Sequence, residues 1–149
     1  MPTFIRQDQA TISVPQLPVA LPFVPSWATL EGGDLEAEDT KTRPGGMLPQ
    51  VTLGGPTTRN DATVSRPYTR ELHPFLVPLE KFAGFGRMAI TYTIMGPNLT
   101  TGKLVTLGPT VTLRGILKNV TRPNWDANSA STAMFSLVMG CDVESHVTQ

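Results

Sequence analysis

Residues 43–68 read RPGGMLPQVTLGGPTTRNDATVSRPY, and this stretch decides the predicted fold. It contains two short runs, residues 50–53 (QVTL) and residues 62–65 (ATVS), in which apolar and polar side chains alternate. Such alternation predicts strands with one buried face and one open face. Residues 54–56 (GGP) are expected to break the sheet between the runs, and Pro67 to close it, because proline cannot donate to a sheet ladder. The pattern alone is typical of an antiparallel pair in a β domain.

The composition indicates a single domain with many strands and turns. The chain has 149 residues, of which 13 are Gly and 14 are Pro. One domain is usual at this length. Only 16% of the residues are charged, whereas about a quarter is usual in soluble proteins. Sparse charge suits a subunit whose surface is largely covered by neighbours, and it also fits an ordinary β-sandwich.

Charge, cysteine and hydropathy exclude several classes of function. The formal net charge is zero, whereas nucleic-acid-binding domains need an excess of Lys and Arg to displace counterions from phosphate. The single cysteine, Cys141, excludes an internal disulfide and a Cys-rich metal site, and its neighbours predict a small core side chain. Neither a signal peptide nor an apolar run of about 20 residues is visible. Synthesis in the cytoplasm without a membrane anchor is expected.

The first 25 residues are expected to form an extended arm. Residues 11–26 (TISVPQLPVALPFVPS) carry a proline every third or fourth position, which rules out an interior helix and breaks sheet ladders. The segment is nevertheless apolar, so it is expected to lie across its own domain or across a neighbouring subunit. The neighbour is favoured, because so short a chain has little core surface to cover. The predicted division is an arm at 1–25, a β domain at 26–144 and a flexible tail at 145–149.

An acidic segment follows the arm. Residues 26–31 (SWATLE) predict a short strand, and residues 34–40 (DLEAEDT) carry much of the acid in the chain. The usual meaning of such a charge run is a solvated loop. Its spacing does not match a calcium-binding loop, which needs alternating Asp or Asn ligands, a central Gly and a terminal Glu.

One short helix is expected within residues 69–83 (TRELHPFLVPLEKFA). Thr69 is a candidate cap, Pro78 is expected to kink or break the helix, and Gly84 to end it. Apolar residues recur three and four apart, which indicates one buried face. They are Leu72, Phe75, Leu76, Leu79 and Phe82.

Further strands are expected in the second half of the chain, where apolar and polar side chains again alternate. They cover residues 86–95, 103–107, 110–120 and 132–142. Gly115 is expected to mark a bulge. A polar loop is predicted at residues 122–131, before the last strand.

No residues are placed to perform catalysis. The two histidines, His73 and His146, belong to no nucleophile or metal motif, and no phosphate-binding loop or serine elbow occurs. The sequence therefore predicts neither an enzyme nor a bound cofactor or metal.

Several short motifs resemble the tail tube proteins of long-tailed bacteriophages. They are residues 30–33 (LEGG), 39–41 (DTK), 43–47 (RPGGM), 51–55 (VTLGG), 63–66 (TVSR) and 113–121 (LRGILKNVT). The resemblance spans about residues 27–144 and is strongest from 31 to 68. The long apolar arm departs from the family pattern.

The resemblance implies a mainly β fold, a tail-tube-type β-sandwich or rolled sheet with one short flanking helix. It also implies hexameric rings that stack into a tube, with strands of six subunits closing one inner barrel. The tube would conduct DNA from the virion into the host. The expected partners are further copies of the chain and other tail proteins: tape measure, terminator and, in a contractile tail, the sheath.

Two sets of residues receive roles from the resemblance. The segment from Glu31 to Lys41 is expected to contact the next ring. The contact set is Glu31, Asp34, Glu36, Glu38, Asp39, Lys41 and Arg43. The polar strand faces are expected to line a water-filled lumen. The candidates are Thr52, Thr63, Ser65, Thr91, Thr93, Thr110 and Thr112.

A neutral lumen would let DNA slide, because a basic wall would hold the polyanion. Two alternatives stay open. One is a β-sandwich adaptor or decoration protein of a virion, and the other is the tube subunit of a phage-derived secretion or injection system.

Overall fold

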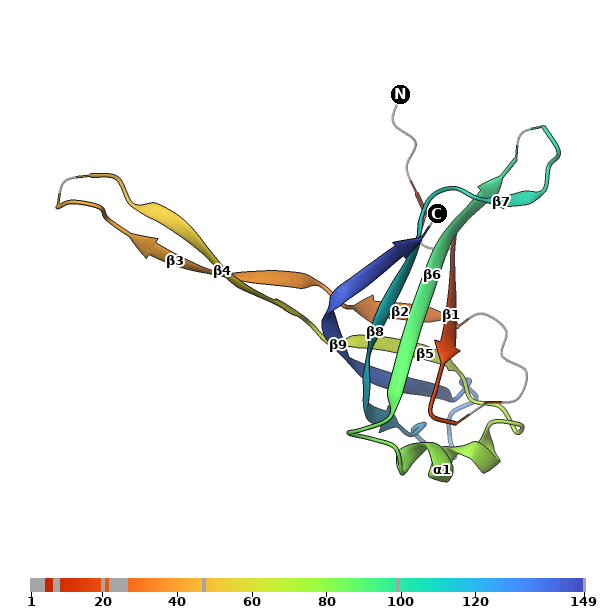
Figure 1. Cartoon of the computed structure of the whole chain (residues 1–149). Coiled ribbons are helices and arrows are strands. Elements are labelled where there is room, and N and C mark those ends of the chain that lie inside the picture. The colour runs from red at the N-terminus through yellow and green to blue at the C-terminus, as the bar shows by residue number, and fades with distance from the viewer. Residues whose placement is uncertain are drawn as a thin grey trace.

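The computed structural model describes residues 5–6, 9–19, 21, 27–46, 48–98 and 100–148. Seven strands form one antiparallel sheet in the order β1-β6-β8-β9-β5-β2, with β7 paired to β6 (Figure 1). They are β1 (Ala10–Gln16), β2 (Thr29–Gly32), β5 (Ala62–Pro67), β6 (Arg87–Pro97), β7 (Leu104–Thr106), β8 (Thr110–Thr121) and β9 (Met134–Thr148). Two more, β3 (Leu35–Thr42) and β4 (Val51–Arg59), form a separate hairpin. The predicted mainly β class is confirmed.

The large sheet rolls up until its two edge strands nearly meet. The backbone N–H of Trp27 donates to the carbonyl oxygen of Ile12 at 2.9 Å, in a single bridge that ties the start of β2 to β1. The register of β8 against β9 shifts between Leu113 and Gly115, as the predicted bulge requires. A Cβ at Gly115 would lie 1.9 Å from the carbonyl oxygen of Gly140. Only glycine lets the two strands cross this closely.

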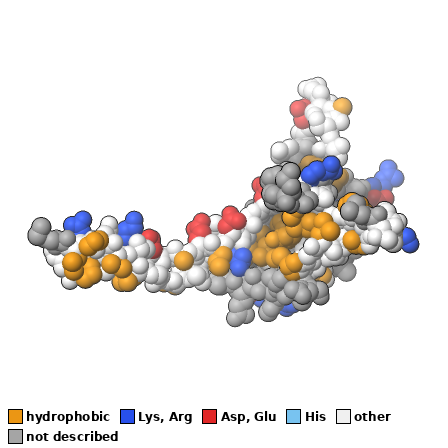
Figure 2. Space-filling model, turned by 90° about the horizontal axis from the view of Figure 1, so that it is seen from above, with side chains coloured by type: hydrophobic (Ala, Val, Ile, Leu, Met, Phe, Trp, Pro, Cys, Tyr) orange, Lys and Arg blue, Asp and Glu red, His pale blue; other side chains and the backbone are white. Residues whose placement is uncertain are grey.

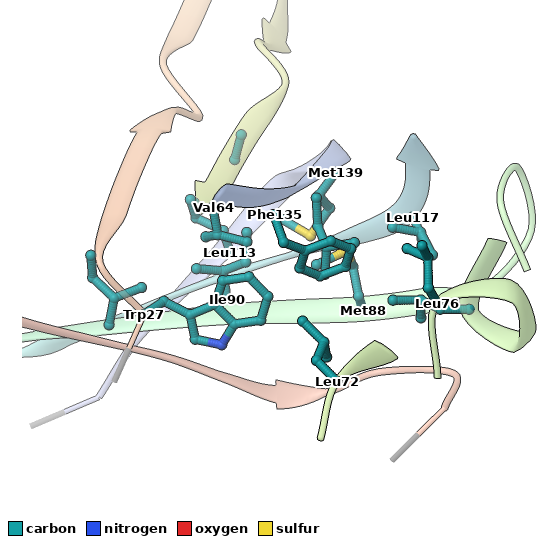
Figure 3. Packing of buried hydrophobic residues seen from close by; sticks show 14 residues of the cluster. Trp27, Val64, Leu72, Leu76, Met88, Ile90, Leu113, Leu117, Phe135 and Met139 are labelled. Carbon is teal, nitrogen blue, oxygen red and sulfur yellow. The ribbon is translucent and has the colours of Figure 1, made fainter. Parts of the chain in front are cut away.

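The hydrophobic core fills the inside of the roll. Alternate residues of β9, β5 and β6 point inward and meet Trp27 and Leu72 (Figure 3). The most deeply buried side chains are Val64, Leu72, Leu79, Met88, Ile90, Leu117, Phe135, Leu137 and Met139. Cys141 is partly buried against this core, and its burial raises the pKa of the thiol. The predicted core position of this cysteine is confirmed in part, because its side chain packs against the core without being fully buried.

A short helical segment closes one end of the roll. It consists of a 3₁₀ turn, η2 (His73–Phe75), and α1 (Leu76–Glu80). Leu72, Leu76 and Leu79 are buried, so the predicted apolar face is confirmed. The predicted cap is wrong, because the residues at the helix starts are Leu72 and Phe75, and neither makes a side-chain cap hydrogen bond.

The described part of the N-terminal arm packs on its own domain, so the favoured neighbouring subunit is wrong for this part. β1 pairs with β6, and its register shifts between Ser13 and Gln16, around Pro15. An edge strand tolerates a proline at such an irregularity. Four apolar side chains beyond Ile12 also touch the core, namely Val14, Leu17, Val19 and Leu21. Residues 22–26 lie outside the described residues.

The C-terminal segment also differs from the expectation. Residues 145–148 were predicted to belong to a flexible tail, but their backbone continues β9 and pairs with β8 through Thr148. The start of β8 supplies the partner, since Thr110 lies opposite Thr148. β9 therefore pairs with β5 along its first residues and with β8 as far as Thr148.

Arg66 is a cation inside this core. It is 6% exposed, its Nη1 has no hydrogen-bond partner, and its guanidinium lies 5.6 Å from the centroid of the Trp27 ring. Burial lowers its pKa. A buried cation without full hydrogen bonding costs stability, and methionine keeps the stem and an aromatic contact.

We therefore expect Arg66→Met to leave the free energy of unfolding unchanged or to raise it by about 1 kcal/mol, as measured by urea denaturation. Arg66→Ala, which also loses the stem, is the control and is expected to lower it. If Arg66→Met lowered the free energy of unfolding as much as Arg66→Ala, the charge itself would be shown to stabilise the fold.

Candidate functional site

The hairpin β3–β4 stands away from the rolled sheet (Figure 1). Three sequence-based expectations are wrong here. The acidic segment is not a loop, because residues 35–42 form β3. Residues 54–56 do not break the sheet, because they lie inside β4. The two runs of the stretch 43–68 do not pair with each other, since β4 pairs with β3 and β5 pairs with β2 and β9.

Glycines shape the hairpin and its root. The register shifts between Ala37 and Asp39, where a Cβ at Gly55 would lie 2.8 Å from the carbonyl oxygen of Glu38. At the root, Gly32 has a φ of 85° and a Cβ there would lie 2.0 Å from the carbonyl oxygen of Asp61. Glycine is therefore required at the point where the chain leaves the roll.

Backbone hydrogen bonds close the hairpin root. Asn60 N–H donates to Asp34 O at 2.8 Å, and Gly33 N–H donates to Asp61 O at 3.2 Å. Arg59 Nη1 adds a bond to the Gly33 carbonyl at 2.8 Å. The direction in which the hairpin leaves the roll is thus fixed by its own chain.

The hairpin buries almost nothing in its own chain. Every residue of β3 is exposed, and in β4 only Arg59 is half-buried. Val51 and Leu53, two residues apart and so on one face, are 44% and 49% exposed, and Leu48 beside them is 54% exposed. An isolated two-stranded hairpin is marginal in water, and clustered exposed apolar residues mark interaction surfaces.

Charge is separated along the hairpin. The predicted contact residues all lie on it or at its root, with the acids near the root and in the middle and Lys41 and Arg43 toward the far end (Figure 2). Glu36 accepts a hydrogen bond from Asn60 Nδ2 at 3.0 Å. The structure thus gathers the predicted contact set on a single protrusion.

Four of the seven predicted lumen residues form a hydroxyl face on β6 and β8. Thr91 Oγ1 lies 3.2 Å from Thr112 Oγ1, and Thr93 Oγ1 lies 3.1 Å from Thr110 Oγ1. The two rows extend onto β1, where Thr11 lies opposite Thr93 and Ser13 opposite Thr91. Sequence reasoning missed Thr11 and Ser13, although their alternation with Ile12 and Val14 was a usable signal.

The other three candidates lie elsewhere. Ser65 Oγ is 2.9 Å from Ser136 Oγ, in a second row that crosses β2, β5, β9 and β8. Thr63 lies on the same outward side of β5, because Ala62 and Val64 point into the core. Thr52 lies on the hairpin, opposite Lys41. The predicted lumen set is therefore divided among three places.

A second candidate surface surrounds the loop at residues 122–133. Arg122 donates to both carboxylate oxygens of Glu80, at 2.6 and 2.8 Å, and these hydrogen bonds lower the pKa of Glu80. Trp125 is 72% exposed and packs edge-on against Tyr68. A cavity of about 530 Å³ lies beside the loop. The salt bridge fastens the loop to α1.

Within the described residues, no group of three or more His, Cys, Asp or Glu side chains could hold a metal ion. The described helices include none that is long and apolar enough to cross a membrane.

No protein-family model and no curated protein matches the sequence. Solved structures do match. A chain of the anti-feeding prophage (AFP) baseplate superposes with a TM-score of 0.71 at 13% identity, over 99% of this chain and 97% of that chain. A chain from the sheath/tube terminator of an extracellular contractile injection system, PVC, gives 0.69 at 16% identity, over 99% of both chains. A chain of the PVC sheath-tube complex superposes with a TM-score of 0.66 at 16% identity, over 97% of this chain and 90% of that chain.

These likenesses define the class of fold. The protein has the mainly β, antiparallel fold found in components of contractile injection systems. At such identities they establish the fold alone. Two of these three chains come from an extracellular contractile injection system and one from the anti-feeding prophage.

Proposed function

We propose that the protein is a structural subunit of a tail-type tube, in which copies of the chain form hexameric rings that stack into a hollow conduit. The observation that carries this proposal is the hairpin β3–β4. It is fully formed, yet it exposes Val51, Leu53 and Leu48 and contributes nothing to its own core. Partner subunits would bury these side chains.

The charge distribution supports a head-to-tail contact between copies. The root carries Glu31, Asp34 and Glu36 against one cation, Arg59, and the far end carries Lys41 and Arg43, so the far end of one copy is complementary to the root of another. Such a contact joins two different surfaces, and interfaces of this kind generate rings when the rotation closes. The fold likeness to sheath-tube and terminator structures supports the same geometry.

The hydroxyl face of β1, β6 and β8 is the proposed lumen wall. It presents Thr91, Thr93, Thr110 and Thr112 in two hydrogen-bonded pairs, and Arg114, opposite Ala89, is the next residue of β8 on the same face. A hydroxyl-rich wall is wetted by water, and the single arginine beside these threonines is too little positive charge to hold a polyanion. In a virion, this tube would let DNA slide through, and its partners would be the tape measure, terminator and sheath proteins.

A second cargo is favoured by the comparisons. The matched structures are an extracellular contractile injection system and the anti-feeding prophage. In a particle of that kind, the same conduit would carry protein instead of a genome. Nuclease-treated particles that still hold protected DNA would support the virion tail, and particles with protein in the lumen would support the injection system.

Electron microscopy of the purified protein tests the central proposal. Rings with sixfold symmetry, or tubes built from them, are expected. A protein that stays monomeric at high concentration would contradict the tube and leave the adaptor as the better function.

Reversing acids in the middle of the hairpin tests the role of the predicted contact set. Glu38→Lys with Asp39→Lys is expected to lower the assembled fraction about tenfold or more, because like charges at an interface disfavour docking. Glu36 is left unchanged because it bonds Asn60. Sedimentation velocity gives the assembled fraction.

Glu71→Lys with Asp126→Lys, two exposed acids on the main domain, is the control with the same change in net charge. Equal assembly of the two variants would contradict a role for the hairpin charges.

A further inference from the structure

The roll has an open seam where its two edge strands diverge. β1 and β2 are the end strands of the sheet order and are joined through the Ile12–Trp27 bridge. Beyond this bridge they separate around a cavity of about 440 Å³. The seam is lined by Ala10, Ile12, Tyr92 and residues 28–32. Hydrophobic side chains gather on this end of the molecule, beside the hairpin root (Figure 2).

The lining of the seam suits an extended protein segment. Ile12, Leu30 and Tyr92 supply an apolar floor, since all three belong to the core or pack against it. Ala10, Ala28 and Gly32 carry little or no side chain, so another backbone can approach closely. Glu31 is exposed at the rim, and Asp34 follows just beyond it.

The outer edge of β2 is also open for backbone pairing. Gly33 N–H donates to Asp61 O at 3.2 Å, and in this register Glu31 lies opposite Thr63 and Thr29 opposite Ser65, so the backbone groups of these residues face β5. Backbone groups alternate in direction along a strand, and those of Leu30 and Gly32 therefore face the seam. Unpaired edge groups of this kind accept a strand from another chain.

We propose that the seam receives the far end of the β3–β4 hairpin from a second copy of this chain. This inference rests on the proposed tube function and names the acceptor surface for the hairpin. The far end offers what the seam lacks: exposed Val51 and Leu53 on one face of the hairpin for the apolar floor, and Lys41, on the opposite face, for the acidic rim above it.

The hairpin does not reach the seam of its own chain. The eight residues of β3 span about 26 Å at the usual strand rise, and the hairpin points away from the roll (Figure 1). The closed root fixes that direction. The occupant is therefore another copy.

In this contact, burial of apolar side chains provides the affinity and the charges determine the orientation. Ion pairs at a solvent-exposed rim contribute little, so the apolar side chains carry most of the affinity. The charges choose the orientation, because the basic far end is attracted to the acidic rim and the acidic root of a second copy is repelled from it.

A charge exchange tests the pairing. Glu31→Lys alone and Lys41→Glu alone are each expected to lower the assembled fraction about tenfold, because each places like charges at the seam. The double variant Glu31→Lys/Lys41→Glu restores opposite charges between copies and is expected to return to within about threefold of the unsubstituted protein. Circular dichroism checks that each variant is folded.

A disulfide test gives an independent readout. In a Cys141→Ser background, Thr29→Cys at the seam and Thr42→Cys on the face of Val51 and Leu53 are expected to cross-link copies into a ladder of oligomers. Thr42→Cys with Thr106→Cys on β7 is the matched control and should give no ladder.

The outcomes separate the two proposals. Rings or tubes without rescue and without the Thr29–Thr42 ladder would overturn the seam as acceptor and leave the tube function standing. Absence of assembly in the unsubstituted protein would overturn both.

Discussion

Excising the hairpin is expected to abolish assembly while the rest of the protein stays folded. The variant removes residues 35–59 and joins Asp34 to Asn60 through an Asn-Gly turn, the preferred two-residue connection between antiparallel strands. The root tolerates this change because Asn60 N–H and Asp34 O are already hydrogen-bonded at 2.8 Å. No residue of β3 or β4 belongs to the core cluster, so the core loses nothing.

The size of the effect follows from burial at the interface. Fully burying one Val or Leu side chain contributes about 1.5–3 kcal/mol, so losing Val51 and Leu53 weakens each contact by at least about a hundredfold. Sedimentation velocity and electron microscopy are expected to show monomers at concentrations where the full chain forms rings.

Thermal unfolding of the excised variant is the control for folding. A cooperative transition with unchanged far-UV circular dichroism is expected. Rings formed without the hairpin would contradict its role, and loss of the cooperative transition would show that the hairpin stabilises its own subunit.

Alternation of side chains predicted the strands that have one buried face. The segments 86–95 and 110–120 became β6 and β8, and in both the inward residues are buried. The three-and-four spacing of Leu72, Leu76 and Leu79 likewise found the covering helix, because burial on one side imposes that spacing. The physics that shaped these segments lies within a single chain.

The hairpin escaped prediction because it has no buried face. β3 reads as an acidic loop, since each of its side chains is exposed and nothing imposes alternation. Residues 54–56 read as a break, but β4 pairs along one edge only, so a proline is tolerated, and Gly55 is needed for the close approach to Glu38. Structure that depends on cross-strand pairing alone leaves little pattern in the sequence.

The sequence named the charged residues that lie on the hairpin, but it did not predict how they are arranged. The charged contact set lies on one protrusion, yet its separation into an acidic root and a basic far end required the register of the hairpin. Among the polar strand residues, the alternation of side chains along β6 correctly predicted that Thr91 and Thr93 lie on one face. It could not show that Thr52 belongs to another sheet, because pairing partners are distant in sequence.

Phe135→Ala is expected to cause the largest loss of stability in the chain. Phe135 is fully buried, and its ring centroid lies 6.3 Å from that of Trp27 and 6.1 Å from that of Tyr68. Truncating a buried phenylalanine costs about 3–5 kcal/mol, through lost burial and the cavity left behind.

Against a total of about 5–15 kcal/mol for a typical domain, that loss brings the protein close to unfolding at ambient temperature. The measurement belongs in the hairpin-excised monomer, because assembly stabilises the folded state by mass action and would hide part of the effect. Phe85→Ala, at a side chain that is 64% exposed, is the matched control and should change the free energy of unfolding by about 0.5 kcal/mol or less. Equal losses for the two variants would mean that β9 does not anchor the core. The roll would then depend on contacts between subunits for its fold as well as for its assembly.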